Sequence, residues 1–142
     1  MAGGPASPLP NDERFELRVL VVEDNIFIAL DLEAQLVEMG HDVVGIAATA
    51  TKAIAMSRQS SPDIAIVDLQ LADGSRGQDA AFVLRNEMGI PSVFVSGSLH
   101  QVTDDEKEAI RPLAMLSKPL LPNELRRTIE AAASSDLAWK DR

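Results

Sequence analysis

Cysteine and tyrosine are both absent from this sequence, and aromatic residues make up only 4% of its 142 residues. Without cysteine the chain has no disulfide, no thiolate nucleophile and no Cys-ligated metal site, so its fold needs no oxidising compartment. The first ten residues, which include Pro5, Pro8 and Pro10, lack the basic start and apolar core of a signal peptide. No apolar run approaches the roughly 18 residues of a membrane span. We therefore expect a soluble, cytoplasmic protein.

Positive charge is also scarce. The sequence has 13 Lys and Arg residues against 22 Asp and Glu residues, which gives a formal net charge of -9. Such a charge repels nucleic-acid backbones and anionic membrane surfaces, so we expect the protein to bind neither. Any phosphate group that the protein handles must therefore be met by a local positive side chain.

Short apolar segments alternate along the chain with segments of helical character. The expected strands are 18–22, 42–47, 63–68, 90–95 and 113–116. The expected helices are 26–39, a segment from Thr49 or Thr51 to about 59, 78–88, a segment from Thr103 to about Pro112, and 122–133. Asn25 is a plausible N-cap for the first helix, and Gly40 ends it.

The alternation of five strands with five helices predicts an α/β fold with a doubly wound parallel sheet. We expect strand order 2-1-3-4-5 with helices on both faces, as in flavodoxin-like folds. The domain should span 17–133, between a flexible N-terminal tail (1–16) and a C-terminal tail (134–142) that contains Trp139. His41 and His100 have no partner at metal-ligand spacing and are expected at the surface.

Residues that can carry chemistry follow the predicted strands: Glu23 and Asp24 after the first, Asp68 after the third, Ser96 after the fourth and Lys118 after the fifth. The carboxyl ends of parallel strands share one edge, and order 2-1-3-4-5 puts Asp68 beside the acidic pair. Three close carboxylates repel one another and favour a hard divalent cation with oxygen ligands. Mg²⁺ is the expected cofactor.

Asp68 can act as a carboxylate nucleophile toward a phosphoryl group, while Lys118 and Ser96 meet phosphoryl oxygens. Each residue also has an ordinary alternative. Asp68 could be a turn or cap residue, Glu23 and Asp24 could favour the positive end of a helix, Ser96 could satisfy loop backbone groups, and Lys118 could be a solvated surface cation. Their joint occurrence at strand ends favours the phosphoryl site.

Four motifs carry a resemblance to a known family. Segments 21–25, 66–68, 94–97 and 117–119 read Val-Val-Glu-Asp-Asn, Ile-Val-Asp, Phe-Val-Ser-Gly and Ser-Lys-Pro. In this order and spacing, over about 18–133, they resemble the receiver domains of two-component response regulators. The resemblance implies that a sensor histidine kinase phosphorylates Asp68. It also assigns the remaining family roles, with Ser96 and Lys118 as the hydroxyl and the lysine, and a Mg²⁺ site formed by Glu23, Asp24, Asp68 and the backbone carbonyl of Gln70.

The chain also departs from the receiver pattern. Receivers usually have Tyr or Phe three residues before the lysine, where this chain has Met115, and the helix beginning at Thr103 is short and polar. We therefore expect phosphorylation to be read out through Ser96, the loop 97–101 and this helix. Segment 71–74 (Leu-Ala-Asp-Gly) resembles receivers that work with HWE or HisKA2 kinases in general stress or light signalling.

The resulting expectation is a stand-alone receiver, monomeric or weakly dimeric, that signals through protein contacts and is not a turnover enzyme. Alternatives are a phosphate sink or feedback regulator of its kinase, a receiver that acts without phosphorylation, and a phosphatase with an aspartyl intermediate. Phosphatases of the haloacid-dehalogenase type have a second Asp two residues after the nucleophile. Gln70 occupies that position here, which argues against this activity.

Overall fold

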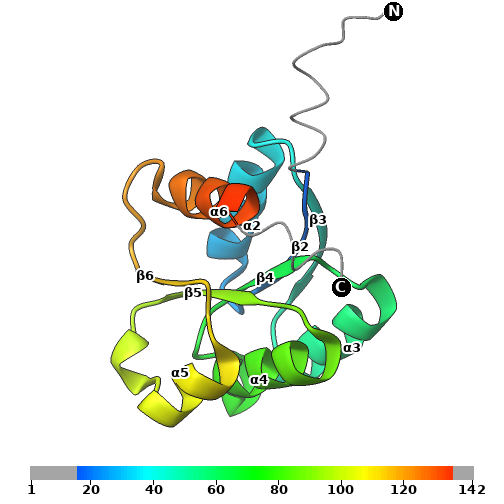
Figure 1. Ribbon diagram of the computed structural model, residues 1–142, viewed down its shortest axis with the longest axis vertical. Coiled ribbons are helices and arrows are strands. Elements are labelled where there is room, and N and C mark those ends of the chain that lie inside the picture. The colour runs from blue at the N-terminus through cyan, green and yellow to red at the C-terminus, as the bar shows by residue number, and fades with distance from the viewer. Residues whose placement is uncertain (1–15, 136–142) are drawn as a thin grey trace, which may run out of the picture.

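The computed structural model describes residues 16–135, and its strands and helices alternate along the chain (Figure 1). The strands are β2 (Arg18–Val22), β3 (Asp42–Ala47), β4 (Ile64–Val67), β5 (Ser92–Ser96) and β6 (Ala114–Ser117). The α-helices are α2 (Ile26–Glu38), α3 (Ala50–Ser60), α4 (Gly77–Met88), α5 (Asp104–Ile110) and α6 (Glu124–Ser135). Two 3-10 turns are η1 (Ala72–Gly74) and η2 (Leu99–Gln101). Most of the two predicted tails, including Trp139, lies outside the described residues.

The strands form one parallel sheet in the order β3-β2-β4-β5-β6, which confirms the predicted order 2-1-3-4-5. Helices α2 and α6 cover one face of the sheet, and α3, α4 and α5 cover the other (Figure 1). The central strand β4 is buried along its whole length. This explains why its sequence is a continuous apolar run and not an alternating one. The doubly wound fold is therefore confirmed.

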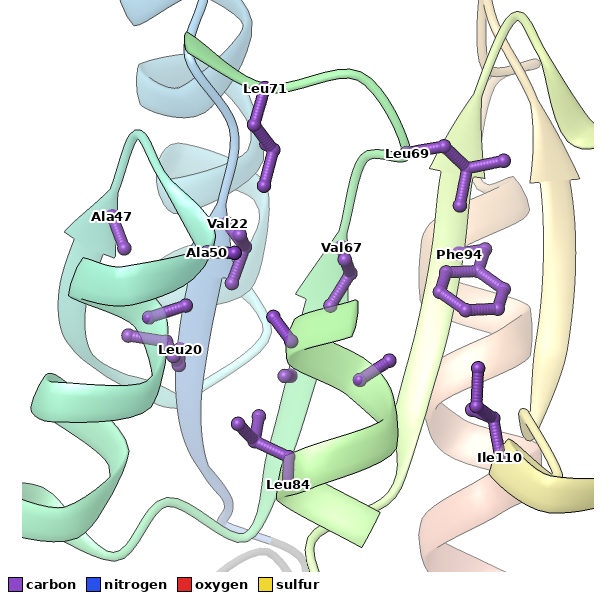
Figure 2. Packing of buried hydrophobic residues seen from close by; sticks show 14 of the residues in the cluster. Leu20, Val22, Ala47, Ala50, Val67, Leu69, Leu71, Leu84, Phe94 and Ile110 are labelled. Atoms are coloured by element: carbon purple, nitrogen blue, oxygen red, sulfur yellow. The ribbon is translucent and has the colours of Figure 1, made fainter. Parts of the chain in front are cut away.

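Each face of the sheet has its own hydrophobic core because successive strand residues point to opposite faces. Leu20 and Val22 pack beneath α3, α4 and α5, together with the fully buried Phe94 of β5 (Figure 2). Val19 and Val21, which alternate with them in β2, pack beneath α2 and α6. The two cores bind the sheet to the helices on both of its faces and so fix where the strand ends lie.

Several boundaries differ from the predicted ones by a few residues. The strand predicted from Ile90 begins at Ser92, and the helix predicted from Pro122 begins at Glu124. Pro91 accounts for the first shift, because proline has no N–H to donate to a sheet ladder. β5 also extends to Ser96, so this residue belongs to the strand and not to the following loop.

The prediction for His41 was wrong. His41 is buried, and its Nδ1 accepts a hydrogen bond from the Leu17 N–H at 3.0 Å. The parallel pairing of β2 with β3 brings the residue before β3 to the start of β2, where the Asp42 N–H also donates to the Leu17 carbonyl at 2.9 Å. His100 is exposed, as predicted. Within residues 16–135, no helix combines the length and apolar character needed to cross a membrane.

Candidate functional site

Asp68 lies directly after β4, at the carboxyl edge of the sheet, and is buried. Its N–H donates to the Val22 carbonyl at 2.9 Å, and its Oδ1 accepts from the Leu69 N–H at 2.7 Å. The first residue of α4, Gly77, packs against it so closely that a Cβ there would lie 1.9 Å from the Asp68 carbonyl oxygen. Backbone contacts on two sides therefore hold Asp68 in place.

Lys118 follows β6 and reaches across the edge to two carboxylates. Its Nζ donates to Glu23 Oε1 at 2.7 Å and to Asp68 Oδ2 at 3.0 Å. The side chains of Glu23 and Asp68 are 2% and 10% exposed, and that of Lys118 is 22% exposed. Residues far apart in the sequence thus form one group of mostly buried charges. We refer to Glu23, Asp24, Asp68 and Lys118 as the strand-end cluster.

The three acidic residues of this cluster offer carboxylate oxygens that all lie within 4.8 Å of one another. Glu23 is buried, and its Oε2 accepts from the Asn25 N–H at 3.1 Å, whereas Asp24 is exposed. With all four groups ionised, three carboxylates and one ammonium leave an excess of two negative charges. A set of hard oxygen donors with uncompensated negative charge fits a divalent cation such as Mg²⁺.

The pKa values of the cluster reflect this excess of acid. Burial raises the pKa of the Glu23 carboxyl above its ordinary value of 4.5, and the Asp68 charge adds to this effect, while Lys118 and the Asn25 N–H only partly oppose it. Burial alone would lower the pKa of Lys118, but its hydrogen bonds and charge interactions with Glu23 and Asp68 raise it above 10.5. The cluster therefore favours the charged form of Lys118 and disfavours the charged form of the buried Glu23.

A family model for the response regulator receiver domain matches residues 19–130, a span that contains all four motifs at the strand ends. The chain belongs to the response-regulator receiver family. This confirms the resemblance that the sequence motifs carry.

Among its relatives, the receiver is 34% identical over 115 residues to the phyllosphere-induced regulator PhyR of Methylorubrum extorquens. The match covers 80% of this chain but 42% of that protein, so the chain spans less than half of that relative. The solution structure of the PhyR receiver domain of Erythrobacter litoralis superposes with a TM-score of 0.77 at 32% identity, covering 84% and 92% of the two chains.

A third match is PhyR of Bartonella quintana, an anti-anti-sigma factor solved in complex with the anti-sigma factor NepR. It is 36% identical with a TM-score of 0.57, and the match covers 61% of this receiver and 36% of that PhyR chain. All three relatives are regulators that carry the PhyR name, which relates this receiver to proteins of regulatory function.

The side chain of Ser96, at the end of β5, is engaged with the following loop. Ser96 is buried, and its hydroxyl oxygen accepts a hydrogen bond from the Ser98 N–H at 3.1 Å. Its carbonyl accepts from the Lys118 N–H at 3.1 Å, which ties the ends of β5 and β6 together. In this structure the hydroxyl thus has the loop-backbone role that the sequence left open as an alternative.

Met115, the residue at the usual aromatic position of receivers, pairs with Phe94 across β5 and β6. It is partly buried and packs against the core beneath α3, α4 and α5. Gln70 is exposed and lies opposite Arg76 in an isolated antiparallel bridge. The receiver therefore presents Gln70 on a closed loop beside the strand-end cluster.

The sequence reasoning missed a groove of about 870 Å³ next to the cluster. Helix α2 and the loop between β6 and α6 form its walls, and Lys118 is one of its lining residues. Phe27 and Leu121, which also line it, are 80% and 65% exposed. The apolar run Leu120-Leu121-Pro122 directly after Lys118-Pro119 was the available signal, because large apolar residues in a surface loop often mark a contact site.

Proposed function

We propose that this receiver accepts a phosphoryl group on Asp68 from a sensor histidine kinase, with Mg²⁺ held by Glu23, Asp24, Asp68 and the backbone carbonyl of Gln70. The observation that carries the proposal is the strand-end cluster: a buried carboxylate contacted by a lysine, beside two further carboxylates. Such a group combines a nucleophile, a cation site and a positive side chain for a phosphoryl oxygen.

In the proposed transfer, an Asp68 carboxylate oxygen forms a bond to phosphorus as the bond between phosphorus and the donor histidine nitrogen breaks. The electron pair of the broken bond leaves with that nitrogen. Bound Mg²⁺ would supply positive charge to the phosphoryl oxygens. Because Asp68 loses its own negative charge on becoming an acyl phosphate, Lys118 can turn from this carboxylate to the new phosphoryl oxygens. Ser96 would donate to another of them after leaving the Ser98 N–H.

The groove supports a protein as the phosphoryl donor. It shares Lys118 with the strand-end cluster and exposes Phe27 and Leu121 at its walls, so a partner seated there reaches the edge of the sheet that carries Asp68. We assign this surface to the phosphotransfer domain of the kinase, and the segment 71–74 favours a kinase of the HWE or HisKA2 type. NepR is not proposed as a partner of this receiver, because the match covers only 36% of the PhyR chain that binds it.

The proposal is tested by the intact mass of the protein after incubation with acetyl phosphate and Mg²⁺. We expect one added phosphoryl group in the wild type and none in Asp68→Asn, which keeps the size of the side chain but not its nucleophilic charge. A wild type that binds Mg²⁺ but stays unmodified with both acetyl phosphate and its kinase would instead indicate a receiver that acts without phosphorylation.

The kinase-docking part has its own test. The double variant Phe27→Ala, Leu121→Ala removes exposed apolar surface from the groove, so we expect slower phosphoryl transfer from the kinase. The rate with acetyl phosphate, measured in parallel, separates lost docking from a damaged site. Equal rates of transfer from the kinase to the wild type and to the variant would remove the groove from the proposal.

A further inference from the structure

The loop that joins Asp68 to α4 is closed by two backbone hydrogen bonds. The Gly77 N–H donates to the Leu69 carbonyl at 2.8 Å, and the Leu71 N–H donates to the Ser75 carbonyl at 3.2 Å. Between these bonds Gln70 and Arg76 lie directly opposite each other. In such a non-hydrogen-bonded antiparallel pair, the flanking bonds use neither the carbonyl nor the N–H of the paired residues. These two bonds therefore hold the backbone of Gln70 opposite that of Arg76 and do not use the Gln70 carbonyl.

Arg76 also connects this loop to α5. Its guanidinium contacts Glu106 Oε2 at 2.6 Å and Asp79 Oδ1 at 3.2 Å. We refer to Arg76, Asp79 and Glu106 as the surface cluster. Glu106 lies in the first turn of α5, whereas Asp79 lies in α4, the helix that Arg76 itself precedes. The contact with Glu106 is therefore the one that joins two separate elements.

Glu106 has a second role at the same time. Its Oε1 accepts from the Thr103 N–H at 3.0 Å, and its own N–H donates to Thr103 Oγ1 at 3.1 Å, which together form the capping box of α5. Burial alone would raise the pKa of Glu106, but the Thr103 N–H and the Arg76 guanidinium lower it below 4.5. One carboxylate thus closes the start of α5 with one oxygen and contacts the Asp68 loop with the other.

The opposite end of α5 is fixed to α4 by different contacts. Arg85 donates to the carbonyls of Ile110 at 3.0 Å and Arg111 at 2.7 Å, and Asn86 donates to the carbonyl of Ala109 at 3.1 Å. Ile110 is also fully buried. The end of α5 is therefore anchored by several groups, and its start depends more strongly on the capping box and on Arg76.

We propose that Arg76 is a positioning residue that holds the Gln70 carbonyl toward the strand-end cluster and, through Glu106, transmits a shift of that carbonyl to the first turn of α5. The inference rests on the proposed function, because the proposed function makes the Gln70 carbonyl a ligand of Mg²⁺. It supplies a readout that needs no aromatic residue at position 115. The first turn of α5 responds to the loop, while the last turn stays bound to α4.

Glu106→Gln is the sharpest variant, because glutamine at this position preserves a capping box but removes the charge that meets Arg76. Asp79→Asn is the matched control, since it neutralises the other partner of Arg76, which belongs to α4 and not to α5. Arg76→Gln removes the guanidinium, and Arg76→Lys restores positive charge. The probe is Mg²⁺ alone, measured by titration calorimetry and by backbone amide NMR.

We expect Glu106→Gln and Arg76→Gln to weaken Mg²⁺ binding by about 3-fold, which is within the roughly 5-fold that an exposed ion pair can contribute to an affinity. Asp79→Asn should bind as the wild type does, and Arg76→Lys should recover part of the loss. In the wild type, Mg²⁺ should shift the amide resonances of Gln70 and Glu106 together. In Glu106→Gln the shift at position 70 should persist, and that in the first turn of α5 should be lost.

Unchanged Mg²⁺ affinity in both Glu106→Gln and Arg76→Gln, with the first turn of α5 responding as before, would overturn the positioning role and leave the proposed function intact. A wild type that binds no Mg²⁺ would instead contradict the proposed function. In that case the positioning role is tested by comparing amide resonances of the metal-free wild type and the metal-free variant. Glu106→Gln must then shift the Gln70 amide resonance relative to the wild type, and an unshifted resonance overturns the role.

Discussion

Two groups of charges include residues at the ends of the loop between Asp68 and α4, and the two groups differ in burial. In the strand-end cluster, Lys118 meets carboxylates that are 2% and 10% exposed. In the surface cluster, Arg76 is 48% exposed, and its partners Asp79 and Glu106 are 65% and 24% exposed. Charges removed from water are costly to leave unpaired, whereas exposed pairs contribute at most about 1 kcal/mol. The two clusters should therefore differ in what they do.

The strand-end cluster carries an excess of negative charge that only a bound cation or a proton can offset, which is the requirement for a site that binds Mg²⁺ and then a phosphoryl group. The surface cluster has little to contribute to stability, but its contacts form and break at low cost. The two proposals therefore assign chemistry and signal transmission to different charges: the buried charges suit the reaction, and the exposed ones suit a detectable change in α5.

The largest effect should come from Gly77, which lies between the two clusters. In Gly77→Ala the new Cβ would meet the Asp68 backbone at 1.9 Å, so either the loop or α4 must move. We expect a loss of about 3 kcal/mol in the free energy of unfolding, as for severe overpacking. Gly97→Ala is the control, because a Cβ there meets nothing within 4 Å. Chemical denaturation that gives both variants the same stability would contradict this account of the loop.

Next in size is Lys118→Met, which leaves Glu23 and Asp68 without their shared cation. Because Lys118 is partly solvated, we expect a loss of about 2 kcal/mol near neutral pH, less than for a fully buried pair. Lys52→Met, on the exposed side of α3, should change stability little. Denaturation curves of the two variants in the same buffer measure the difference.

This effect should depend on pH in a defined direction. The folded-state pKa of Glu23 lies above 4.5 and must rise further without Lys118. A carboxyl with a raised folded-state pKa supports folding fully below its unfolded value, and this support is lost as pH rises through the folded-state pKa. Lys118→Met should thus be closest to the wild type below pH 4.5 and diverge as pH increases. A difference that grows on acidification would be inconsistent with the arrangement of charges.

Asp24→Asn should lower the affinity for Mg²⁺ without lowering the stability of the fold. Because Asp24 is exposed, we expect little change in the free energy of unfolding, but a loss of about 10-fold or more in Mg²⁺ affinity, equal to about 1.4 kcal/mol. Asp31→Asn, on the exposed side of α2, should retain wild-type affinity. Titration calorimetry that finds equal affinity in the two variants would exclude Asp24 from the metal site.

The smallest change in stability is expected for Glu106→Gln. The loss should stay below about 1 kcal/mol and shrink as salt is added, because its partner Arg76 is half exposed. Since the folded-state pKa of Glu106 is lowered, its contribution is present above pH 4.5 and is lost as pH falls through that lower value. Denaturation at low and high salt checks this. A large loss in the free energy of unfolding that added salt does not reduce would show that Glu106 behaves like the buried charges, and would contradict the comparison.

The sheet could be predicted because each strand gives a local signal. The run at 64–67 is apolar on both faces, and Asn25 and Thr103 mark helix starts with side chains that cap the backbone within three residues. The convergence of Glu23, Asp68 and Lys118 followed from topology alone, since parallel strands end at one edge. For these features, local pattern and overall fold point to the same structure.

Other features depend on contacts between elements that are far apart in the sequence, and no local sequence pattern indicates such contacts. Arg85 and Asn86 looked like ordinary polar residues of α4, yet they hold the end of α5 by its carbonyls. Arg76 gave no sign in the sequence that it meets Glu106, 30 residues further along the chain. The burial of His41 likewise follows from the pairing of β3 with β2.

Localising the modified residue tests the central claim most directly. After acetyl phosphate and Mg²⁺, borohydride reduction converts an aspartyl phosphate to homoserine, which peptide mass spectrometry can assign to a position. The account predicts homoserine at position 68, in the wild type only when both reagents are present, and none in Asp68→Asn. Homoserine at position 24, or a modified protein with an unreduced Asp68, would contradict it.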